Sequence, residues 1–305
     1  MTTPINIAVP PTITLRSGCY NHGRFVTETL DSVAAQDCGE FEWIIVDDAS
    51  TDDSAARIRG WLGLHGASLR ERKIDVRFIA HERNVGIART FNEILNLAQG
   101  QFLCGLSCDD RMLPQRMSAA KQHAHKFSPD DVCFYGDSWI IDEDGTRKER
   151  LFIEGHRDSE DRPEGELFQT LLAGNFIPSP SVIVRRDALI SAGGYDESLP
   201  YEDYDMWLRL SRKGRFRYYH ETLIEYRIHG ENLHQKISDW RRINYWIFRK
   251  HIDHEDGVRR FFGNLRGLEK HGQISPEIWG DLRSLDLAGY PDWERKRRAI
   301  LAADV

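Results

Sequence analysis

The stretch QFLCGLSCDDR, residues 101–111, decides how this chain is interpreted. Residues 102–106 form a short apolar run bounded by turn-forming residues, which is typical of a buried strand in a parallel sheet. Asp109 and Asp110 follow directly, and such sheets bind ligands beyond the carboxyl ends of their strands. Two acids at this place predict a divalent metal and a phosphorylated substrate. The alternative is that they only turn the chain and cap the next helix.

The first 110 residues alternate between strand and helix four times. Strands are expected at 12–17, 41–46, 74–80 and 102–106, and helices at 25–36, from about residue 50 onward, and at 87–99. Short connections between them predict a parallel sheet wound with helices. The glycines at 60, 63 and 66 are expected to end the second helix and begin a loop, because a dinucleotide fingerprint needs its glycines between strand and helix.

The second part of the chain mixes elements. We expect a helix near 113–127, a strand at 132–136, a hairpin turned at Asp144-Gly145 and a polar, mobile segment at 154–164. A short helix, a strand within 175–186, a helix starting near Glu202 and strands within 216–228 should follow. From Lys236 onward the periodicity is helical. The predicted fold class is therefore α/β, a mostly parallel sheet flanked by helices with a helical extension at 236–305.

Composition narrows the function classes. The 305 residues are 40% hydrophobic and 29% charged, which fits a globular protein. No apolar run is long enough to span a bilayer, and the first residues lack the features of a signal peptide. The five cysteines are odd in number and include no CxxC pair, so a reduced, cytoplasmic chain is expected. The net charge of −7 argues against nucleic acid as a partner.

Three acidic pairs stand out: 47–48, 109–110 and 202–203. The first two should share one crevice, because the carboxyl ends of parallel strands lie on the same edge. Successive strand side chains point opposite ways, so only one of Asp109 and Asp110 should bind a metal directly, while the other acts through water or the substrate. Asp203 should lie in the first turn of a helix, where the dipole favours a carboxylate able to accept a proton. Acids also occupy first turns for stability alone.

Taken together, these motifs resemble family 2 glycosyltransferases with the GT-A fold. The strings TLRSGCYNHGRF (14–25), FEWIIVDDASTDDS (41–54) and ERNVGIARTFNEILNLAQGQFLCGLSCDD (82–110) resemble the nucleotide-binding half of that family, here about residues 1–112. VIVRRDALISAGGYDESLPYEDYDMWLRLSRKG (182–214) and YRIHGENLH (226–234) resemble its acceptor half, about 113–235. The resemblance covers roughly residues 12–234 and implies a GT-A domain at 1–235.

The resemblance also implies roles for residues of the nucleotide-binding half. Asp48 should recognise the base of a nucleotide sugar, and Tyr20 should lie against that base. Arg89 should lie near the phosphates. The acid pair corresponds to the DxD-type motif of the family, in which Asp110 would bind Mn²⁺ or Mg²⁺ and Asp109 would contact the nucleotide.

For the acceptor half, the resemblance makes Asp203 of the YED triplet the catalytic base and places Glu202 on the acceptor side. His229 is positioned like a residue that some members use beside the metal, although a surface or core histidine is the plain alternative. The implied reaction is an inverting transfer of a sugar from a nucleoside-diphosphate sugar to a hydroxyl of a glycan or lipid-linked acceptor in surface polysaccharide biosynthesis. A UDP-sugar is the donor expected before the others. The alternative is a non-catalytic relative that binds nucleotide sugars.

Two departures from the family pattern affect these expectations. Residues 16–19, RSGC, stand where a Pro-Thr or Pro-Ser usually precedes the Tyr-Asn, and Ser107 stands where an acid is often found. The chain also lacks a QxxRW signature, which argues against a processive synthase.

The aromatic and basic residues after Lys236 fit either a peripheral contact with the inner face of a membrane or an ordinary helical extension or dimer contact. The second interpretation is favoured.

Overall fold

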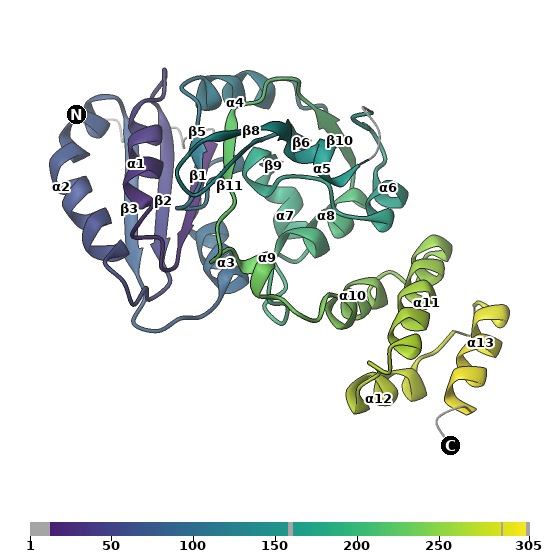
Figure 1. The fold of residues 1–305 in the computed structure, drawn as a ribbon. Helices are drawn as coiled ribbons and strands as arrows, with labels where there is room; N and C mark the ends of the chain where they lie inside the picture. Colours follow the sequence, from purple (N-terminus) through teal and green to yellow (C-terminus); the bar gives the residue numbers. More distant parts are fainter. Residues whose placement is uncertain (1–12, 158–160, 288, 303–305) are drawn as a thin grey trace, which may run out of the picture. The chain divides into compact units, whose positions relative to one another are not determined.

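The computed structural model describes residues 13–157, 161–287 and 289–302. The chain divides into two compact units, Met1–His234 and Gln235–Val305 (Figure 1). The first unit contains both sheets, and the second consists of helices.

A seven-stranded sheet forms the centre of the first unit, in the order β10-β6-β9-β4-β1-β2-β3. Neighbouring strands are parallel except at β9, which is antiparallel to β4 and β6. This confirms the expected mostly parallel sheet. The strands in sheet order are β10 (Arg215–Tyr218), β6 (Asp131–Tyr135), β9 (Ile183–Arg185), β4 (Phe102–Gly105), β1 (Ile13–Cys19), β2 (Phe41–Asp47) and β3 (Ile74–Ala80).

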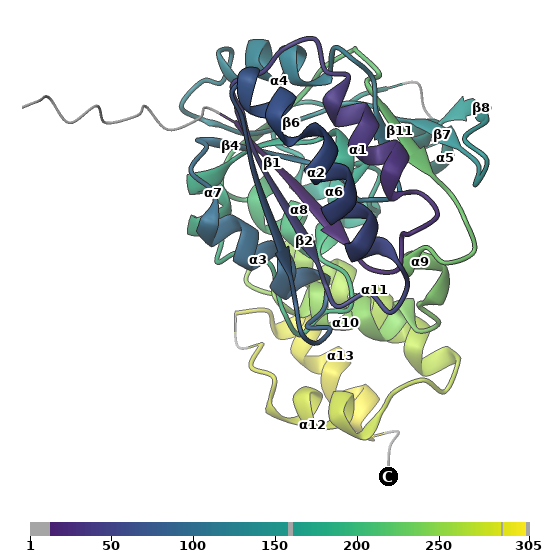
Figure 2. The ribbon, with the colours of Figure 1, turned by 90° about the vertical axis from the view of Figure 1, so that its left-hand side faces the viewer.

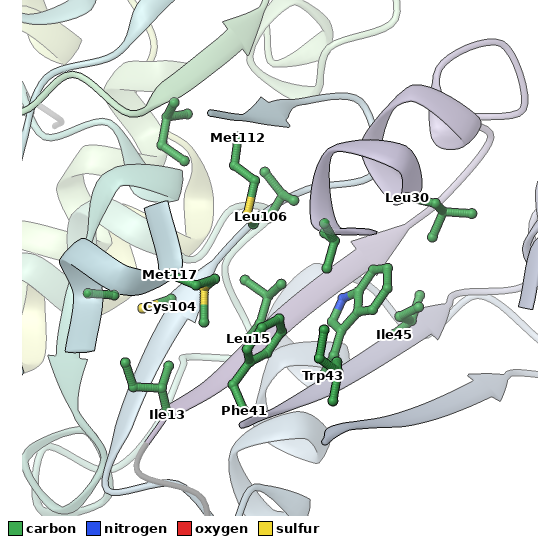
Figure 3. Close-up of a cluster of buried hydrophobic side chains, with 14 of the residues drawn as sticks. Ile13, Leu15, Leu30, Phe41, Trp43, Ile45, Cys104, Leu106, Met112 and Met117 are labelled. Atoms are coloured by element: carbon green, nitrogen blue, oxygen red, sulfur yellow. The ribbon is translucent and has the colours of Figure 1, made fainter. Parts of the chain in front are cut away.

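Helices cover both faces of this sheet. One face packs against α1 (Val26–Ala34), α2 (Ser54–Glu71) and α4 (Arg116–Ala124), and Figure 2 looks onto the first two. Alternate residues of the central strands supply the core there, because a strand points every second side chain to the same side. Figure 3 shows this core, which includes Ile13, Leu15, Leu30, Phe41, Trp43, Ile45, Cys104, Leu106, Met112 and Met117.

The opposite face of the sheet packs against α3 (Ile87–Leu97). The approach is close at Gly18 of β1, where an added Cβ would lie 2.8 Å from a ring carbon of Phe91. A larger residue at this position would therefore push α3 away from the sheet. Helices α7 (Arg186–Ser191) and α8 (Asp203–Ser211) lie beside α3. The loop that joins them is linked to α3 by a hydrogen bond from the side chain of Asn92 to the carbonyl of Tyr195.

The sequence predicted that the glycines at 60, 63 and 66 end α2. This prediction is wrong, because all three lie inside the helix. Ile58, Trp61 and Leu69 of this helix are buried against the sheet. Packing of this apolar face offsets the roughly 1 kcal/mol that each internal glycine costs relative to alanine.

A smaller sheet of four strands lies in the same unit, in the order β5-β11-β7-β8. The expected hairpin is present as β7 and β8, and Gly145 adopts the left-handed conformation, with φ of 82°, that its turn requires. The segment expected to be polar and mobile contains part of α5, and residues 158–160 of it lie outside the described residues. The remaining elements of this unit are β5 (Arg111–Met112), β11 (Ile224–Arg227), β7 (Trp139–Ile141), β8 (Arg147–Leu151), α5 (Phe152–His156), α6 (Phe168–Ala173), the 3₁₀ helix η1 (Ser179–Ser181) and, reaching into the next unit, α9 (Leu233–Lys236).

The second unit is built from α10 (Trp240–Arg249), α11 (Glu255–Lys270), α12 (Pro276–Ser284) and α13 (Pro291–Ala302). Its aromatic residues Tyr245, Phe248, Phe261 and Phe262 are buried in its own core. The hydroxyl of Tyr245 donates a hydrogen bond of 2.5 Å to Asp281. These rings therefore stabilise the helical unit itself. Among the described residues, no helix combines the length and apolar character needed to cross a membrane.

Trp43 allows a test of the main core. Its side chain is fully buried and its indole N–H donates to the hydroxyl of Ser17 at 3.0 Å. We expect Trp43→Ala to lower the free energy of unfolding by about 3–5 kcal/mol because it leaves a cavity. Leu64→Ala, at an 83% exposed position of α2, is the control and should change it by less than about 0.5 kcal/mol. Urea denaturation measures both, and equal effects of the two substitutions would contradict this packing.

Candidate active site

Loops that follow three parallel strands meet at one edge of the large sheet. The chain continues the strand ladder there: the N–H of Asp48 donates to the carbonyl of Cys19 at 2.8 Å, and the N–H of Cys108 donates to that of Gly18 at 3.1 Å. Asp48 follows β2 and Asp109 follows β4. Both therefore lie at the edge of the sheet where β1 also ends, as the parallel arrangement requires.

Asp109 meets two histidines at this edge. Its Oδ2 lies 3.1 Å from Nε2 of His229 and 3.8 Å from Nε2 of His22, and one ligand atom from each of the three residues lies within 4.8 Å of the others. The side-chain amide of Asn232 also donates to Oδ2, at 3.2 Å. Oδ1 of Asp109 is buried without a hydrogen-bond partner. An unpartnered buried carboxylate oxygen beside two imidazoles is an arrangement suited to a divalent cation.

Asp110 does not join this group, in contrast to the sequence prediction that paired it with His229. Its Oδ1 accepts a hydrogen bond of 2.8 Å from the backbone N–H of Arg227. Burial and the charge of Asp109 raise the pKa of Asp110 well above its usual range. Burial would also raise the pKa of Asp109, but the charge of His22 and a hydrogen bond from His229 outweigh it and lower that pKa. Asp109 is therefore the ionised member of the pair.

Arg227 holds the backbone of Asp109 in position. Its guanidinium is completely buried and donates to the carbonyl of Asp109 at 2.7 Å and to the carboxylate of Glu28 at 2.7 Å. It also reaches the carbonyls of Asp142 and Glu143 in the turn between β7 and β8. A buried guanidinium needs such partners because an unpaired buried charge is costly.

Asp203 opens α8, as predicted. Its Oδ1 accepts from the N–H of Tyr204 at 2.6 Å, and its Oδ2 accepts from the side chain of Asn175 at 3.1 Å. Burial raises the pKa of Asp203 to about 6 against these two hydrogen bonds, which lower it. Burial and the charge of Asp203 raise the pKa of Glu202 to about 7. The positive charge of Arg16 acts on both acids in the opposite direction.

Tyr226 connects the two acidic groups. Burial is the largest cause that raises the pKa of its hydroxyl well above the usual range. The next causes, in decreasing order, are the charges of Asp110, Asp109, Asp203 and Glu202. Charges act over short distances in a partly buried site. The acids after β4 and those at the start of α8 are therefore all near enough to Tyr226 to raise the pKa of its hydroxyl.

Asp48 is held in a network of its own. Its carboxylate accepts from the backbone N–H groups of Val85 and Gly86, both at 2.8 Å, and contacts Nδ1 of His81 at 2.8 Å. Nε2 of His81 contacts Glu93 at 2.7 Å. Burial would lower the pKa of His81, but both acids outweigh it and raise the pKa. A carboxylate has about four acceptor sites, so Asp48 retains one for a ligand.

Tyr20 and Arg89 lie in more open surroundings. Tyr20 follows β1 directly and is 44% exposed, so its ring has a free surface. Arg89 lies in the first turn of α3 and pairs with Glu197 at 2.9 Å. A phosphate at Arg89 would have to compete with that carboxylate.

Several residues of this region were not singled out from the sequence. Their only sequence signal is proximity to predicted positions: His22 is two residues after Tyr20, and Tyr226, Arg227 and Asn232 flank His229 within YRIHGEN. Asn175 had no such signal.

The chain matches the sequence profile described as "Glycosyl transferase family 2" over residues 18–192, more than half of its length. It is 25% identical over 247 residues to an uncharacterized glycosyltransferase of Methanocaldococcus jannaschii, covering 79% of each chain. It is 29% identical over 218 residues to an uncharacterized protein of Mycobacterium tuberculosis, covering 67% of this chain but 64% of that one, slightly less than two thirds.

Solved structures have the same fold. S. aureus TarS in complex with UDP-GlcNAc superposes with a TM-score of 0.62 at 19% identity, covering 92% of this chain and 78% of the other. A mannosyltransferase from Pyrobaculum calidifontis in complex with GDP-Man and Mn²⁺ gives 0.58 at 14% identity, covering 97% and 86%. The fold is thus the GT-A type expected from the sequence. The profile match, which spans the loops carrying Tyr20, Asp48 and Asp109, shows that the chain belongs to glycosyl transferase family 2 and is a glycosyltransferase.

Proposed function

We propose that this chain transfers a sugar from a nucleoside-diphosphate sugar, with a UDP-sugar as the preferred donor, to a hydroxyl of a glycan or lipid-linked acceptor. The transfer inverts the anomeric carbon and belongs to surface polysaccharide biosynthesis. The observation that carries this proposal is the cluster of Asp109, His22 and His229 beyond the carboxyl ends of the parallel strands, in a chain that belongs to glycosyl transferase family 2. This cluster is suited to a metal and a diphosphate, and Asp203, at the start of α8, is suited to proton removal from an acceptor. The complexes of the two similar structures with UDP-GlcNAc and GDP-Man support a nucleotide-sugar donor.

Asp203 is the proposed general base. Both of its oxygens already accept one hydrogen bond each, which orients the carboxylate and leaves a lone pair free to receive a proton. The acceptor oxygen forms its bond to the anomeric carbon while the bond to the diphosphate breaks. The acceptor proton passes to Asp203 as this happens. A single displacement of this kind inverts the anomeric centre.

Glu202 is assigned to the acceptor side. Burial and then the charge of Asp203 raise the pKa of Glu202 to about 7. The neutral carboxyl is a hydrogen-bond donor, so at neutral pH Glu202 can donate to an acceptor hydroxyl while Asp203 accepts.

On the donor side, Tyr20 would lie against the base and Asp48 would accept a hydrogen bond from it. Tyr20 has the exposed ring that stacking requires, and Asp48 keeps one acceptor site. Arg89 would contact phosphate after leaving Glu197.

The residues around Asp109 fit a divalent ion, Mn²⁺ or Mg²⁺. We assign Asp109 and His229 to hold it, because Oδ1 of Asp109 is buried without a partner and Asp110 is turned toward Arg227. When bound, the ion would neutralise charge that develops on the leaving diphosphate.

A thermal-shift screen tests donor and metal together. Melting temperature is measured with UDP, GDP, CMP or dTDP, each with and without Mn²⁺. One nucleoside diphosphate should raise it in a metal-dependent way, because a ligand that binds the folded state stabilises it. At about 100 times its Kd the ligand adds roughly 2.7 kcal/mol.

Two variants sharpen this screen. Asp109→Ala should lose the metal-dependent part of the shift. Asp110→Asn should keep it, because an amide oxygen can still accept the N–H of Arg227. The reverse pattern would assign the metal to Asp110. No shift with any nucleotide would contradict the proposed donor, whereas a nucleotide shift without sugar transfer would favour the non-catalytic relative.

Asp203→Asn should slow sugar transfer by roughly 10²–10⁴-fold, the usual contribution of a general base. The nucleotide-dependent thermal shift should persist, since Asp203 lies on the acceptor side. Activity is measured as release of the nucleoside diphosphate from its sugar donor, with a panel of glycan acceptors. Normal turnover by this variant would exclude Asp203 as the base. Asp205→Asn, two residues further along α8 at a carboxylate that pairs with Arg209, provides the comparison.

The pH dependence follows from the pKa of Asp203, about 6. Transfer needs the ionised form of Asp203 and the neutral form of Glu202, whose pKa is about 7, so kcat/KM should rise about tenfold per pH unit below pH 6 and decline above pH 7. The folded-state pKa lies above the unfolded value of about 3.9, so the ionised side chain destabilises the fold above pH 6 and this cost disappears in acid. Asp203→Asn should therefore melt at a temperature at or above that of the unchanged protein at pH 8. A flat pH–rate profile would contradict the assignment.

A further inference from the structure

We propose that His22 is a third protein ligand of the metal, so that His22, Asp109 and His229 form a site of two imidazoles and one carboxylate. Such a site holds a transition-metal ion before the nucleotide arrives and discriminates against Mg²⁺. This inference rests on the proposed function, because it concerns the same metal.

The ring of His22 is presented by a rigid turn. The N–H of His22 donates to the hydroxyl of Ser54 at 2.9 Å, and its carbonyl accepts from the N–H groups of Phe25 and Val26, both at 2.8 Å. This backbone starts α1 and would keep its bonds if the side chain were changed. The fold therefore positions the backbone that carries this imidazole.

The spacing of the three side chains suits an ion between them. Nε2 of His22 lies 3.8 Å from Oδ2 of Asp109, which is too long for a hydrogen bond. Donors that share an ion at about 2.1 Å lie roughly 3–4 Å from one another. All three donor atoms here lie within 4.8 Å.

The carboxylate of Asp109 supports the same conclusion, because its Oδ1 is buried without a hydrogen-bond partner. Nδ1 of His22 is also buried without a partner, although the proposed donor of that ring is Nε2. Buried polar atoms are nearly always paired, and each exception calls for a missing ligand, ion or water. The direct contact between His229 and Asp109 is a hydrogen bond that an entering ion would replace.

The donor set determines the choice of ion. Mg²⁺ prefers oxygen ligands and keeps several waters, whereas imidazole suits transition metals. A site with a single imidazole leaves most positions to water and phosphate oxygens, which suits either class. Two imidazoles move the preference toward ions such as Mn²⁺ and Co²⁺, and three preformed ligands allow binding without a nucleotide.

Metal binding to the nucleotide-free full chain tests this inference. Free Mn²⁺ is followed by electron paramagnetic resonance during titration, and Mg²⁺ is then added as a competitor. The unchanged protein should bind Mn²⁺ and release little of it to Mg²⁺. His22→Ala should weaken Mn²⁺ binding by at least about tenfold, since loss of even an outer-shell partner costs 10–100-fold. His125→Ala, at an exposed position after α4, should have no effect.

His22→Asp separates a ligand from a merely structural residue. A carboxylate can bind the ion but favours Mg²⁺ more than an imidazole does. This variant should therefore bind metal while the preference for Mn²⁺ over Mg²⁺ falls by about tenfold. Melting temperatures without metal establish that each variant is folded.

Equal Mn²⁺ affinity in His22→Ala and the unchanged protein would overturn the inference, as would equal affinity of the unchanged protein for Mn²⁺ and Mg²⁺. Absence of Mn²⁺ binding without nucleotide would overturn it as well. In each of these cases a Mn²⁺-dependent shift with a nucleoside diphosphate would leave the proposed function standing. Loss of that shift in the unchanged protein would instead remove the proposed function.

Discussion

The site depends on one buried positive charge, the guanidinium of Arg227. Its acceptors come from three separate parts of the chain: the turn after β4, the turn between β7 and β8, and helix α1. Because a buried guanidinium cannot be left without partners, these parts are held in one arrangement. The small sheet thereby supports the large one at the point where Asp109 stands.

This support also explains why two adjacent acids have different properties. Asp110 is buried and accepts the N–H of Arg227, while Asp109 faces two imidazoles. One carboxylate can be ionised at low cost and its neighbour cannot, since two buried charges side by side repel each other. In a second pair, burial raises the pKa of both Glu202 and Asp203, and the charge of Asp203 raises that of Glu202 further. Perturbed acids that face one region are typical of catalytic sites.

The sequence predicted the alternating half of the fold well because each strand is a local signal. β2 and β3 begin where the apolar runs begin, at Phe41 and Ile74, and short connections force them to be parallel. The glycines of α2 led to a wrong prediction of where this helix ends. Packing of the apolar face of α2 against the sheet outweighed the low helix propensity of glycine.

Side-chain direction at the site was beyond the sequence for a different reason. Which acid of the pair faces the crevice is set by Arg227, 118 residues after Asp109, and a local pattern cannot show such a contact. The role of Asp203 could be inferred from its position at a helix start, but its raised pKa depends on burial by the folded chain. His22 shows its proximity to Asp109 only in three dimensions.

The network around Asp48 has a consequence for mutagenesis. The carboxylate that would read the base also anchors the loop leading into α3, through Val85 and Gly86. Reading and anchoring are therefore inseparable at this residue: a substitution that removes the carboxylate also frees the loop and, with it, the start of the helix that carries Arg89. Weaker nucleotide binding after such a change would measure loop order and base recognition together, and donor preference would have to be engineered from Tyr20 or the neighbouring loops instead.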